Sequence, residues 1–152
     1  MKPIIWTNGD YSISTDPNAI DLETVHTYLT NESYWAAGVP RAVVEKSIRH
    51  SLCFSLFQRE AQVGFARIVT DTATFAYLAD VFILAGHRGH GLGKWLVECI
   101  KAHPELKGLR RWLLATADAH GLYAQYGFQP LANPDRIMEI RDLEVYEKGS
   151  PR

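Results

Sequence analysis

The chain has 152 residues, and its 16 Lys and Arg against 17 Asp and Glu give a formal net charge of −1. A chain of this length can bury roughly 70% of its unfolded surface, so it needs neither disulfides nor metal to build a core. With 47% apolar and 22% charged residues it is typical of a globular protein, not of a disordered or fibrous one. The near-neutral charge excludes a global basic field for a nucleic-acid backbone, so we expect no nucleic-acid partner.

The sequence favours one cytoplasmic domain over residues 1–152. No apolar core of a signal peptide appears near the start. The least polar stretch, residues 74–86, is too short to cross a bilayer and contains Asp80, so we expect no membrane partner. Cys53 and Cys99 form no disulfide framework, and each lies in an apolar pattern where it would pack as a small apolar side chain.

The first half of the chain predicts a strand and two helices, followed by three strands. Residues 11–15 alternate like a short strand, Asp16-Pro17 offers a helix start, and apolar residues recur at helical spacing to residue 29. A loop over 31–38 leads to Pro40, which suits the first turn of a second helix. The three strands that follow are separated by short polar turns, which favour an antiparallel meander. Their predicted ranges are 52–57, 63–69 and 75–84.

The second half predicts a parallel crossover. A helix with one apolar face follows the third of these strands, and residues 112–115 form a further strand. A short helix near 122–126 ends at Gly127, and one or two C-terminal strands are expected near 137–140. The sum is an α/β (α+β) domain with a mixed, mostly antiparallel sheet and helices on both faces.

The most informative segment is a glycine-rich loop between a predicted strand and a predicted helix. It reads Arg88, Gly89, His90, Gly91, Leu92, Gly93 and Lys94. Glycine lets the backbone turn tightly and approach a ligand, and the free N–H groups of a helix N-terminus bind anions. Two flanking cations add local positive charge, so the loop could hold a pyrophosphate. The alternative is a turn that merely joins two elements.

Two common phosphate motifs do not fit this loop. The P-loop pattern requires glycine where Arg88 stands and Ser or Thr where Trp95 stands. The dinucleotide pattern G-x-G-x-x-G requires glycine at Lys94. The spacing is instead Arg-x-x-Gly-x-Gly.

That spacing resembles the signature of the GNAT superfamily of acyl-CoA-dependent N-acyltransferases, Gln/Arg-x-x-Gly-x-Gly/Ala after a strand. A second landmark of that family, Leu-Tyr-x-x-x-Gly-Phe late in the chain, matches residues 122–128. The element order also agrees over roughly residues 10–140. The resemblance implies a GNAT fold and an N-acetyltransferase that moves an acetyl group from acetyl-CoA to a primary amine, without a metal.

The resemblance also implies where acetyl-CoA binds. The N–H groups of residues 88–94 would hold its pyrophosphate. The strand before the loop would splay away from the strand near Trp112, and the pantetheine arm would bond to main-chain groups around Phe82 and Ile83. A donor at Ile83 would stabilise the oxyanion that develops in the transition state.

Catalysis, by the same resemblance, is direct transfer in a ternary complex with Tyr123 as general acid. An ordinary tyrosine has a pKa of about 10 and is protonated at neutral pH, as an acid must be. The alternative for Tyr123 is an aromatic side chain of the core. Tyr126, one helical turn further, is the competing phenol.

The sequence departs from the common family pattern at the position of the general base. Many family members carry Glu nine positions before the motif, where this chain has Ala79. The adjacent Asp80 lies in an apolar strand and could accept the substrate proton, or it could form a structural salt bridge or hydrogen bond. His120 is a further candidate, with a surface role as its default. Thr116 replaces an Asn that in relatives often helps to hold the coenzyme.

The acceptor side in this fold is usually built from the first two helices and their loop. Glu32 could attract an ammonium group, and Tyr34 and Trp35 could form an apolar or cation-binding wall. Alternatively, the two aromatic side chains plug a corner between helices. Residues 133–141 could close the other side, and a homodimer is possible. The competing functional hypothesis is a coenzyme-A-binding sensor or assembly module with little or no catalysis.

Overall fold

The computed structural model describes residues 1–147. Its strands are β1 (Ile5–Asn8), β2 (Tyr11–Ser14), β3 (Leu52–Gln58), β4 (Ala61–Thr70), β5 (Phe75–Ile83) and β6 (Arg111–Leu114). Its α-helices are α1 (Leu22–Asn31), α2 (Arg41–Arg49), α3 (Leu92–Ala102) and α4 (His120–Ala124). Short 3-10 helices lie at η1 (Pro17–Ala19), η2 (Ala85–His87), η3 (Pro104–Leu106) and η4 (Pro134–Arg136).

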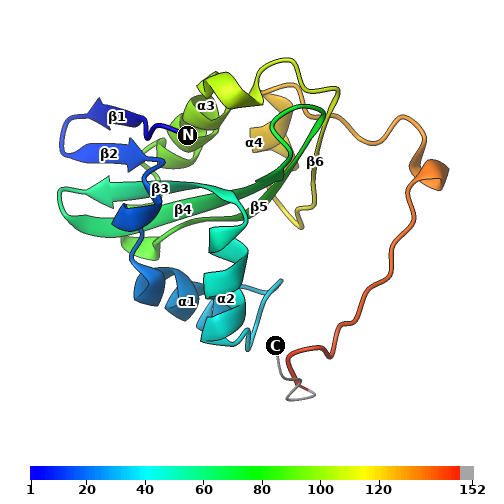
Figure 1. Ribbon diagram of the computed structural model, residues 1–152, viewed down its shortest axis with the longest axis horizontal. Helices are drawn as coiled ribbons and strands as arrows, with labels where there is room; N and C mark the ends of the chain where they lie inside the picture. The colour runs from blue at the N-terminus through cyan, green and yellow to red at the C-terminus, as the bar shows by residue number, and fades with distance from the viewer. Residues whose placement is uncertain (148–152) are drawn as a thin grey trace.

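The six strands form one sheet in the order β1-β2-β3-β4-β5-β6. Each of the first four neighbouring pairs is antiparallel, and β5 with β6 is parallel. Helices α1 and α2 cover one face, and α3 and α4 lie on the other (Figure 1). The expectation of a mixed, mostly antiparallel sheet with helices on both faces is therefore confirmed, as is the parallel crossover through α3.

Each face of the sheet has its own apolar cluster. On the α3 side, Phe54, Leu56 and Ile68 of the sheet pack with Leu96 and Ile100 of the helix. On the α1–α2 side, the sheet residues Phe65 and Phe82 pack with residues of both helices. The buried residues on the two faces therefore form two different clusters, and Leu84 after β5 packs against both.

The start of the chain differs from the expectation in two places. Residues 5–8, to which no element was assigned, form β1, which pairs with β2 around Gly9 at a φ of +60°. The Asp16-Pro17 start yields only the turn η1, and α1 begins later, where the side chain of Asp21 accepts a hydrogen bond from Thr24 N–H. An aspartate cap therefore sets the start of the helix, as its preference for that position favours.

The expected C-terminal strands near 137–140 are wrong for this structure. Residues 129–144 are all exposed, and η4 is the element that they contain. Pro130 and Pro134 restrict the backbone and lack N–H groups, and the chain swings away from the sheet at this point (Figure 1). A β-prone sequence forms a strand only beside a partner, and these residues have none in residues 1–147. Among the described residues 1–147, no helix is long and apolar enough to cross a membrane.

Candidate active site

The glycine-rich loop presents a row of unbonded N–H groups. Gly89 and Gly91 have φ values of +83° and +75°, which only glycine adopts without strain, and Gly91 caps α3 with no side-chain hydrogen bond. Among residues 1–147, the N–H groups of residues 89–94 donate to no carbonyl or side chain. A Cβ at Gly89 or Gly91 would meet open space. These glycines are therefore required by the backbone conformation, and the loop leaves room for a ligand.

Arg88 has a bonding partner on each side of the loop. Its Nε donates to the Ile83 carbonyl at 2.9 Å, and its Nη2 donates to the Tyr28 hydroxyl at 3.1 Å. The side chain thus ties the loop to the end of β5 and to α1. His90 and Lys94 remain exposed beside the free N–H groups, whereas Leu92 anchors the helix in the core.

Strands β5 and β6 separate halfway along β5. Phe75–Leu78 pair with Arg111–Leu114, and residues 79–83 have no partner on β6. Leu84 N–H donates to Val63 on β4, so alternation turns the main-chain groups of Ile83 toward the gap and those of Phe82 toward β4. The Phe82 ring stacks on Tyr28 at 4.0 Å and is buried on the α1 side. Of the two residues expected beside pantetheine, Ile83 is the one with main-chain groups facing the gap.

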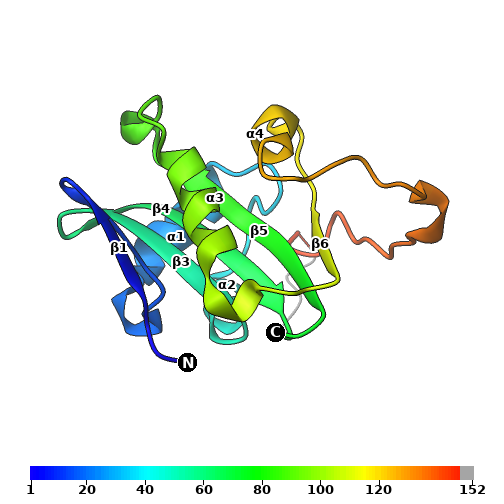
Figure 2. The same ribbon diagram turned by 90° about the horizontal axis from the view of Figure 1, so that it is seen from above.

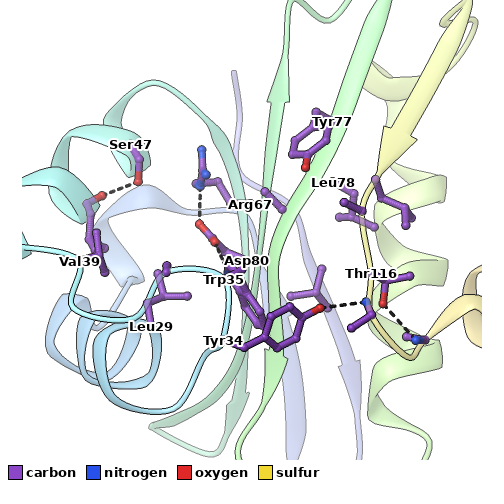
Figure 3. Close-up of a pocket in the computed structure, with 18 of the residues that line it drawn as sticks. Leu29, Tyr34, Trp35, Val39, Ser47, Arg67, Tyr77, Leu78, Asp80 and Thr116 are labelled. Carbon is purple, nitrogen blue, oxygen red and sulfur yellow. Dashed lines mark hydrogen bonds and ion pairs between the residues drawn. The ribbon is translucent and has the colours of Figure 1, made fainter. Parts of the chain in front are cut away.

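A cavity of about 710 Å³ lies at this separation. Its lining includes Tyr34 and Trp35 from the loop after α1, Ala79 and Asp80 from β5, and Tyr123 from α4. The structure thus brings together four of the residues predicted for catalysis and substrate binding. Figure 3 shows Trp35 beside Asp80 of β5, and Tyr34 directed toward the segment that carries Thr116.

Tyr123 is buried, with 7% of its surface exposed, and its ring packs edge-on to Phe128. Burial raises its pKa to about 12, with smaller contributions from Tyr34 and Asp118. The phenol therefore keeps its proton throughout the neutral range. Tyr126 is directed elsewhere, since its hydroxyl bonds to the Lys94 carbonyl and to Glu98 on α3.

Asp80 is held from two sides. Its Oδ2 accepts from Arg67 Nε at 2.7 Å, and its Oδ1 accepts from Trp35 Nε1 at 2.8 Å (Figure 3). The side chains of Asp80 and Arg67 are only 10% and 19% exposed. Asp80 has a φ of +55° at an irregularity in the β4–β5 register, and this turns its carboxylate toward the cavity wall. The Asp80 carboxylate thus forms both a salt bridge and a hydrogen bond, which is the structural alternative that the sequence analysis gave for this residue.

Tyr34 and Trp35 belong to the segment between α1 and α2, which we call the aromatic loop, and Tyr34 joins it to the far side of the cavity. Its hydroxyl accepts a hydrogen bond from Ala117 N–H at 2.9 Å, and its ring meets Trp35 edge-on at 5.0 Å. Tyr34 and Trp35 are 65% and 41% exposed, so they do not plug a helix corner. Together they span from β5 to the segment after β6, as Figure 3 shows.

Some predicted residues lie outside the cavity. Glu32 and His120 are exposed and do not belong to its lining, although Glu139 and Arg141 from the expected closing segment do. The sequence analysis did not identify Arg67 as a residue of the site. It could have been identified as the single cation in an apolar strand, because the next strand carries a single acid, Asp80.

Within residues 1–147, no cluster of three or more His, Cys, Asp or Glu could hold a metal ion. Both cysteines are buried, and burial raises the pKa of each thiol to about 12, so neither is a thiolate at neutral pH.

Comparison with known proteins identifies the family. The family model described as "Acetyltransferase (GNAT) domain" matches residues 49–130. A protein of Gibberella zeae, provisionally named an acetyltransferase, is 34% identical over 146 residues, which cover 82% of this chain and 81% of the relative.

Solved structures agree with this assignment. A protein of Xanthomonas campestris pv. campestris, assigned to the GNAT family, is 48% identical with a TM-score of 0.88, and the match covers 90% of this chain and 96% of that one. A protein of Clostridium acetobutylicum crystallised with acetyl-CoA has a TM-score of 0.60 at 15% identity, over 88% of this chain and 96% of that one, which shows the shared fold alone. On these grounds the chain belongs to the GNAT family of acetyltransferases.

Proposed function

We propose that residues 1–152 act as one N-acetyltransferase domain that moves the acetyl group of acetyl-CoA directly to a primary amine. The observation that carries this proposal is the row of free N–H groups at residues 89–94, at the end of the gap between β5 and β6. Backbone donors at a helix N-terminus bind a diphosphate, and an open edge of β5 offers hydrogen bonds to an extended chain. Coenzyme A carries both a diphosphate and an extended pantetheine chain.

In this proposal, the free N–H groups of residues 89–94 hold the diphosphate, with His90 and Lys94 beside it, whereas the Arg88 N–H already donates to the Ala85 carbonyl at 3.4 Å. Pantetheine lies along the open edge of β5. The Ile83 N–H stabilises the negative charge that develops on the thioester oxygen as the amine attacks. The Ile83 carbonyl already accepts from Arg88, which holds this peptide in place before substrate arrives.

Tyr123 acts on the departing sulfur. A thiol has an ordinary pKa of about 8.5, well below the value of about 12 that burial gives Tyr123. The phenol therefore stabilises the sulfur chiefly by donating a hydrogen bond. The neutral amine attacks, and the proton that its nitrogen then loses ends on the thiolate as the carbon–sulfur bond breaks. The products are an acetylated amide and coenzyme A as free thiol.

Asp80 receives a supporting role in this proposal. Because both of its oxygens already accept hydrogen bonds, it positions Trp35 and Arg67 at the acceptor side instead of taking the proton directly. Tyr34 and Trp35 then form the wall against which the amine lies, and their faces favour a cationic or apolar acceptor. Glu32, at the exposed end of α1, would act only on the approach of a cation.

The test is a panel of amines with acetyl-CoA, covering amino acids, polyamines, arylalkylamines and lysine peptides. Free thiol and acetylated product are measured in parallel. The proposal predicts that at least one amine gives equal amounts of both. Tight binding of acetyl-CoA by calorimetry, with no amine-dependent thiol release in any class, would favour a binding module and overturn it.

A further inference from the structure

Arg67 has a free hydrogen-bond donor in the wall of the cavity. Its side chain is only 19% exposed. Its Nε donates to Asp80, and its Nη1 donates to the Ser51 hydroxyl at 3.2 Å, whereas Nη2 has no partner among residues 1–147. A guanidinium keeps its charge throughout the neutral range, and a donor withdrawn from water without an acceptor costs free energy. Nη2 is therefore a donor that a bound ligand can satisfy.

Tyr77 offers a second donor beside Arg67. The residues that flank Arg67 on β4 and Tyr77 on β5 are buried in the cluster on the α3 side, so both side chains point to the α1–α2 side. Arg67 pairs with Ala79, which makes Tyr77 its diagonal neighbour, within reach of a long side chain. Tyr77 lines the same cavity, and its hydroxyl bonds to no residue in the described part of the chain.

The aromatic loop connects Arg67 to the segment after β6. Trp35 Nε1 donates to the carboxylate of Asp80, which Arg67 also binds. The Trp35 ring meets Tyr34 edge-on at 5.0 Å, and the Tyr34 hydroxyl accepts from Ala117 N–H at 2.9 Å. Figure 3 shows these side chains in succession across the cavity. The two rings thus form an apolar surface that leads from Arg67 to the segment after β6.

The other end of this surface carries the opposite charge. Asp118 lines the cavity there, and within residues 1–147 its carboxylate has no partner. The pKa of Tyr123 is raised first by burial and then by the nearby groups Tyr34 and Asp118, so the Asp118 carboxylate lies close to the phenol. Strand β6 diverges from β5 on its way to α4, which carries Tyr123 (Figure 2). A free carboxylate beside the proposed reaction centre attracts the ammonium form of an amine.

The remaining charges of the cavity do not cancel this arrangement. Asp80 is not available to an ammonium group, because both of its oxygens already accept hydrogen bonds. Glu139 and Arg141 also line the cavity, but they are exposed and of opposite charge, so together they add no net charge. Since Asp80 offsets the charge of Arg67, a single carboxylate suits the free Nη2 better than a dianion such as phosphate.

The separation of the two ends sets the length of the ligand. Arg67 lies on β4 and Asp118 follows β6, so two strand spacings, about 10 Å, separate the strands that lead to them. The Arg67 guanidinium leans toward β5 to reach Asp80, which leaves roughly 5 to 10 Å for a ligand. The amine and carboxylate of an α-amino acid share one carbon and cannot span this distance. An extended chain of several carbons, or a ring, can span it.

We propose that the acceptor is an ω-amino acid, with its amine and its carboxylate at opposite ends of an apolar chain or ring. The assignment rests on the proposed acetyl transfer and names the substrate class of the same cavity. Arg67 Nη2 and the Tyr77 hydroxyl donate to the carboxylate. The apolar spacer lies against Trp35 and Tyr34, and Asp118 attracts the amine to the thioester.

The transfer itself then balances as in the proposed function. The neutral amine forms a bond to the thioester carbon, and the carbon–sulfur bond breaks. The proton that the nitrogen loses ends on the sulfur. The products are an N-acetylated ω-amino acid, whose carboxylate is unchanged, and coenzyme A as free thiol. Arg67 and Tyr77 are therefore specificity-determining residues, because they contact the substrate at the end that does not react.

Two matched pairs of amines test the assignment: δ-aminovalerate with its primary amide, and para-aminomethylbenzoate with its primary amide. Each amide keeps the amine and the shape of its acid and lacks the negative charge. For at least one pair we expect kcat/KM of the acid to be about tenfold or more above that of the amide, chiefly through KM, because a guanidinium–carboxylate hydrogen bond is charge-assisted. Norvaline, an α-amino isomer of δ-aminovalerate, should react at least about tenfold less well than that acid.

The outcomes separate the substrate class from the acetyl transfer. Equal kcat/KM for acid and amide in both pairs, or two inactive acids beside another active amine, would overturn the assignment and leave acetyl transfer standing. Absence of thiol release with every amine, while calorimetry shows bound acetyl-CoA, would instead contradict the proposed function on which the assignment rests.

Variants then identify the residues that select the carboxylate. Arg67→Lys keeps a cation beside Asp80 and removes Nη2, so it should lower the acid-to-amide ratio of kcat/KM about tenfold. Tyr77→Phe should lower this ratio about threefold. The controls are Arg49→Lys, in an exposed pair on α2, and Tyr11→Phe, whose hydroxyl bonds to His87; both should leave the ratio unchanged. Damage to the fold lowers kcat/KM for acid and amide alike, so an unchanged ratio in both Arg67→Lys and Tyr77→Phe would overturn the assignment.

Discussion

The Arg67 Nε and the Asp80 Oδ2 lie 2.7 Å apart, on neighbouring strands and 13 positions apart in the chain. This contact places an ion pair where the apolar interior of the sheet meets the cavity, with Trp35 bonded to the other oxygen of the same carboxylate. The pair therefore links the register of β4 and β5 to the position of the aromatic loop.

We expect Asp80→Asn to lower the free energy of unfolding by about 2 to 4 kcal/mol, because it leaves the guanidinium of Arg67 without its charge partner in a largely buried place. Asn tolerates the positive φ of this residue, so the backbone is retained. The KM for the amine should rise while the KM for acetyl-CoA stays within about twofold. Urea unfolding and steady-state kinetics measure the two effects.

The control for this substitution is Arg49→Gln, which breaks the exposed Glu45–Arg49 pair and should change stability by less than about 0.5 kcal/mol. Equal losses of unfolding free energy in the two variants would show that burial of the Arg67–Asp80 pair does not increase its contribution to stability.

Tyr123→Phe should lower kcat about 100-fold, with unchanged affinity for acetyl-CoA, because it removes the hydrogen-bond donor to the departing sulfur and keeps the ring in its packing place. Tyr126→Phe is the matched control, since its hydroxyl bonds to α3 and not to the cavity. Calorimetry gives the affinity and thiol release gives kcat. A Tyr123→Phe variant with full kcat would remove this residue from the chemistry.

The pH dependence of kcat gives a further check on Tyr123. Since burial raises its pKa to about 12, loss of the phenol proton cannot reduce the rate below pH 10. The rate should rise with pH as the amine substrate loses its proton, and then stay level. A fall in rate between pH 8 and 10 that is absent in Tyr123→Phe would contradict the raised pKa.

Gly91→Ala should weaken acetyl-CoA binding by tenfold or more. Its φ of +75° costs a side chain about 1 to 2 kcal/mol, and its Cβ would occupy the space that the proposed diphosphate needs. Gly108→Ala is the control, with a φ of +74° and equally open surroundings in the loop before β6. Both variants should lose similar stability in thermal unfolding, and only Gly91→Ala should lose affinity. Equal affinities would place the diphosphate elsewhere.

His103 should make the protein less stable in mild acid. It is 1% exposed, its Nδ1 accepts from Glu105 N–H, and burial lowers its pKa. The unfolded chain binds the proton first, so stability is complete above the unfolded pKa of about 6.5 and falls as the pH drops below it, by up to about 1.4 kcal/mol per pH unit. His103→Asn keeps a capping acceptor and should flatten this slope between pH 6.5 and 5 in urea unfolding, whereas His120→Gln, on the surface, should not.

Local sequence was sufficient for the features that depend on neighbours in the chain. The glycine-rich loop and the start of α3 follow from residues 88–94, because positive φ and a free helix N-terminus are properties of a few adjacent residues. The antiparallel meander follows from short turns in the same way. The family landmarks at residues 88–93 and 122–128 made the position of Tyr123 predictable, although not its distance from the rest of the site.

Tertiary structure alone decided the contacts that span the chain. Tyr34 meets Ala117 across 83 positions, and the pairing of Arg67 with Asp80 depends on an irregular β4–β5 register that no local pattern encodes. Tertiary structure also determines the conformation of residues 137–140. Their composition suits a strand, but no strand lies beside them in the described part of their own chain. A strand needs a partner, and whether one is within reach depends on the path of the whole chain.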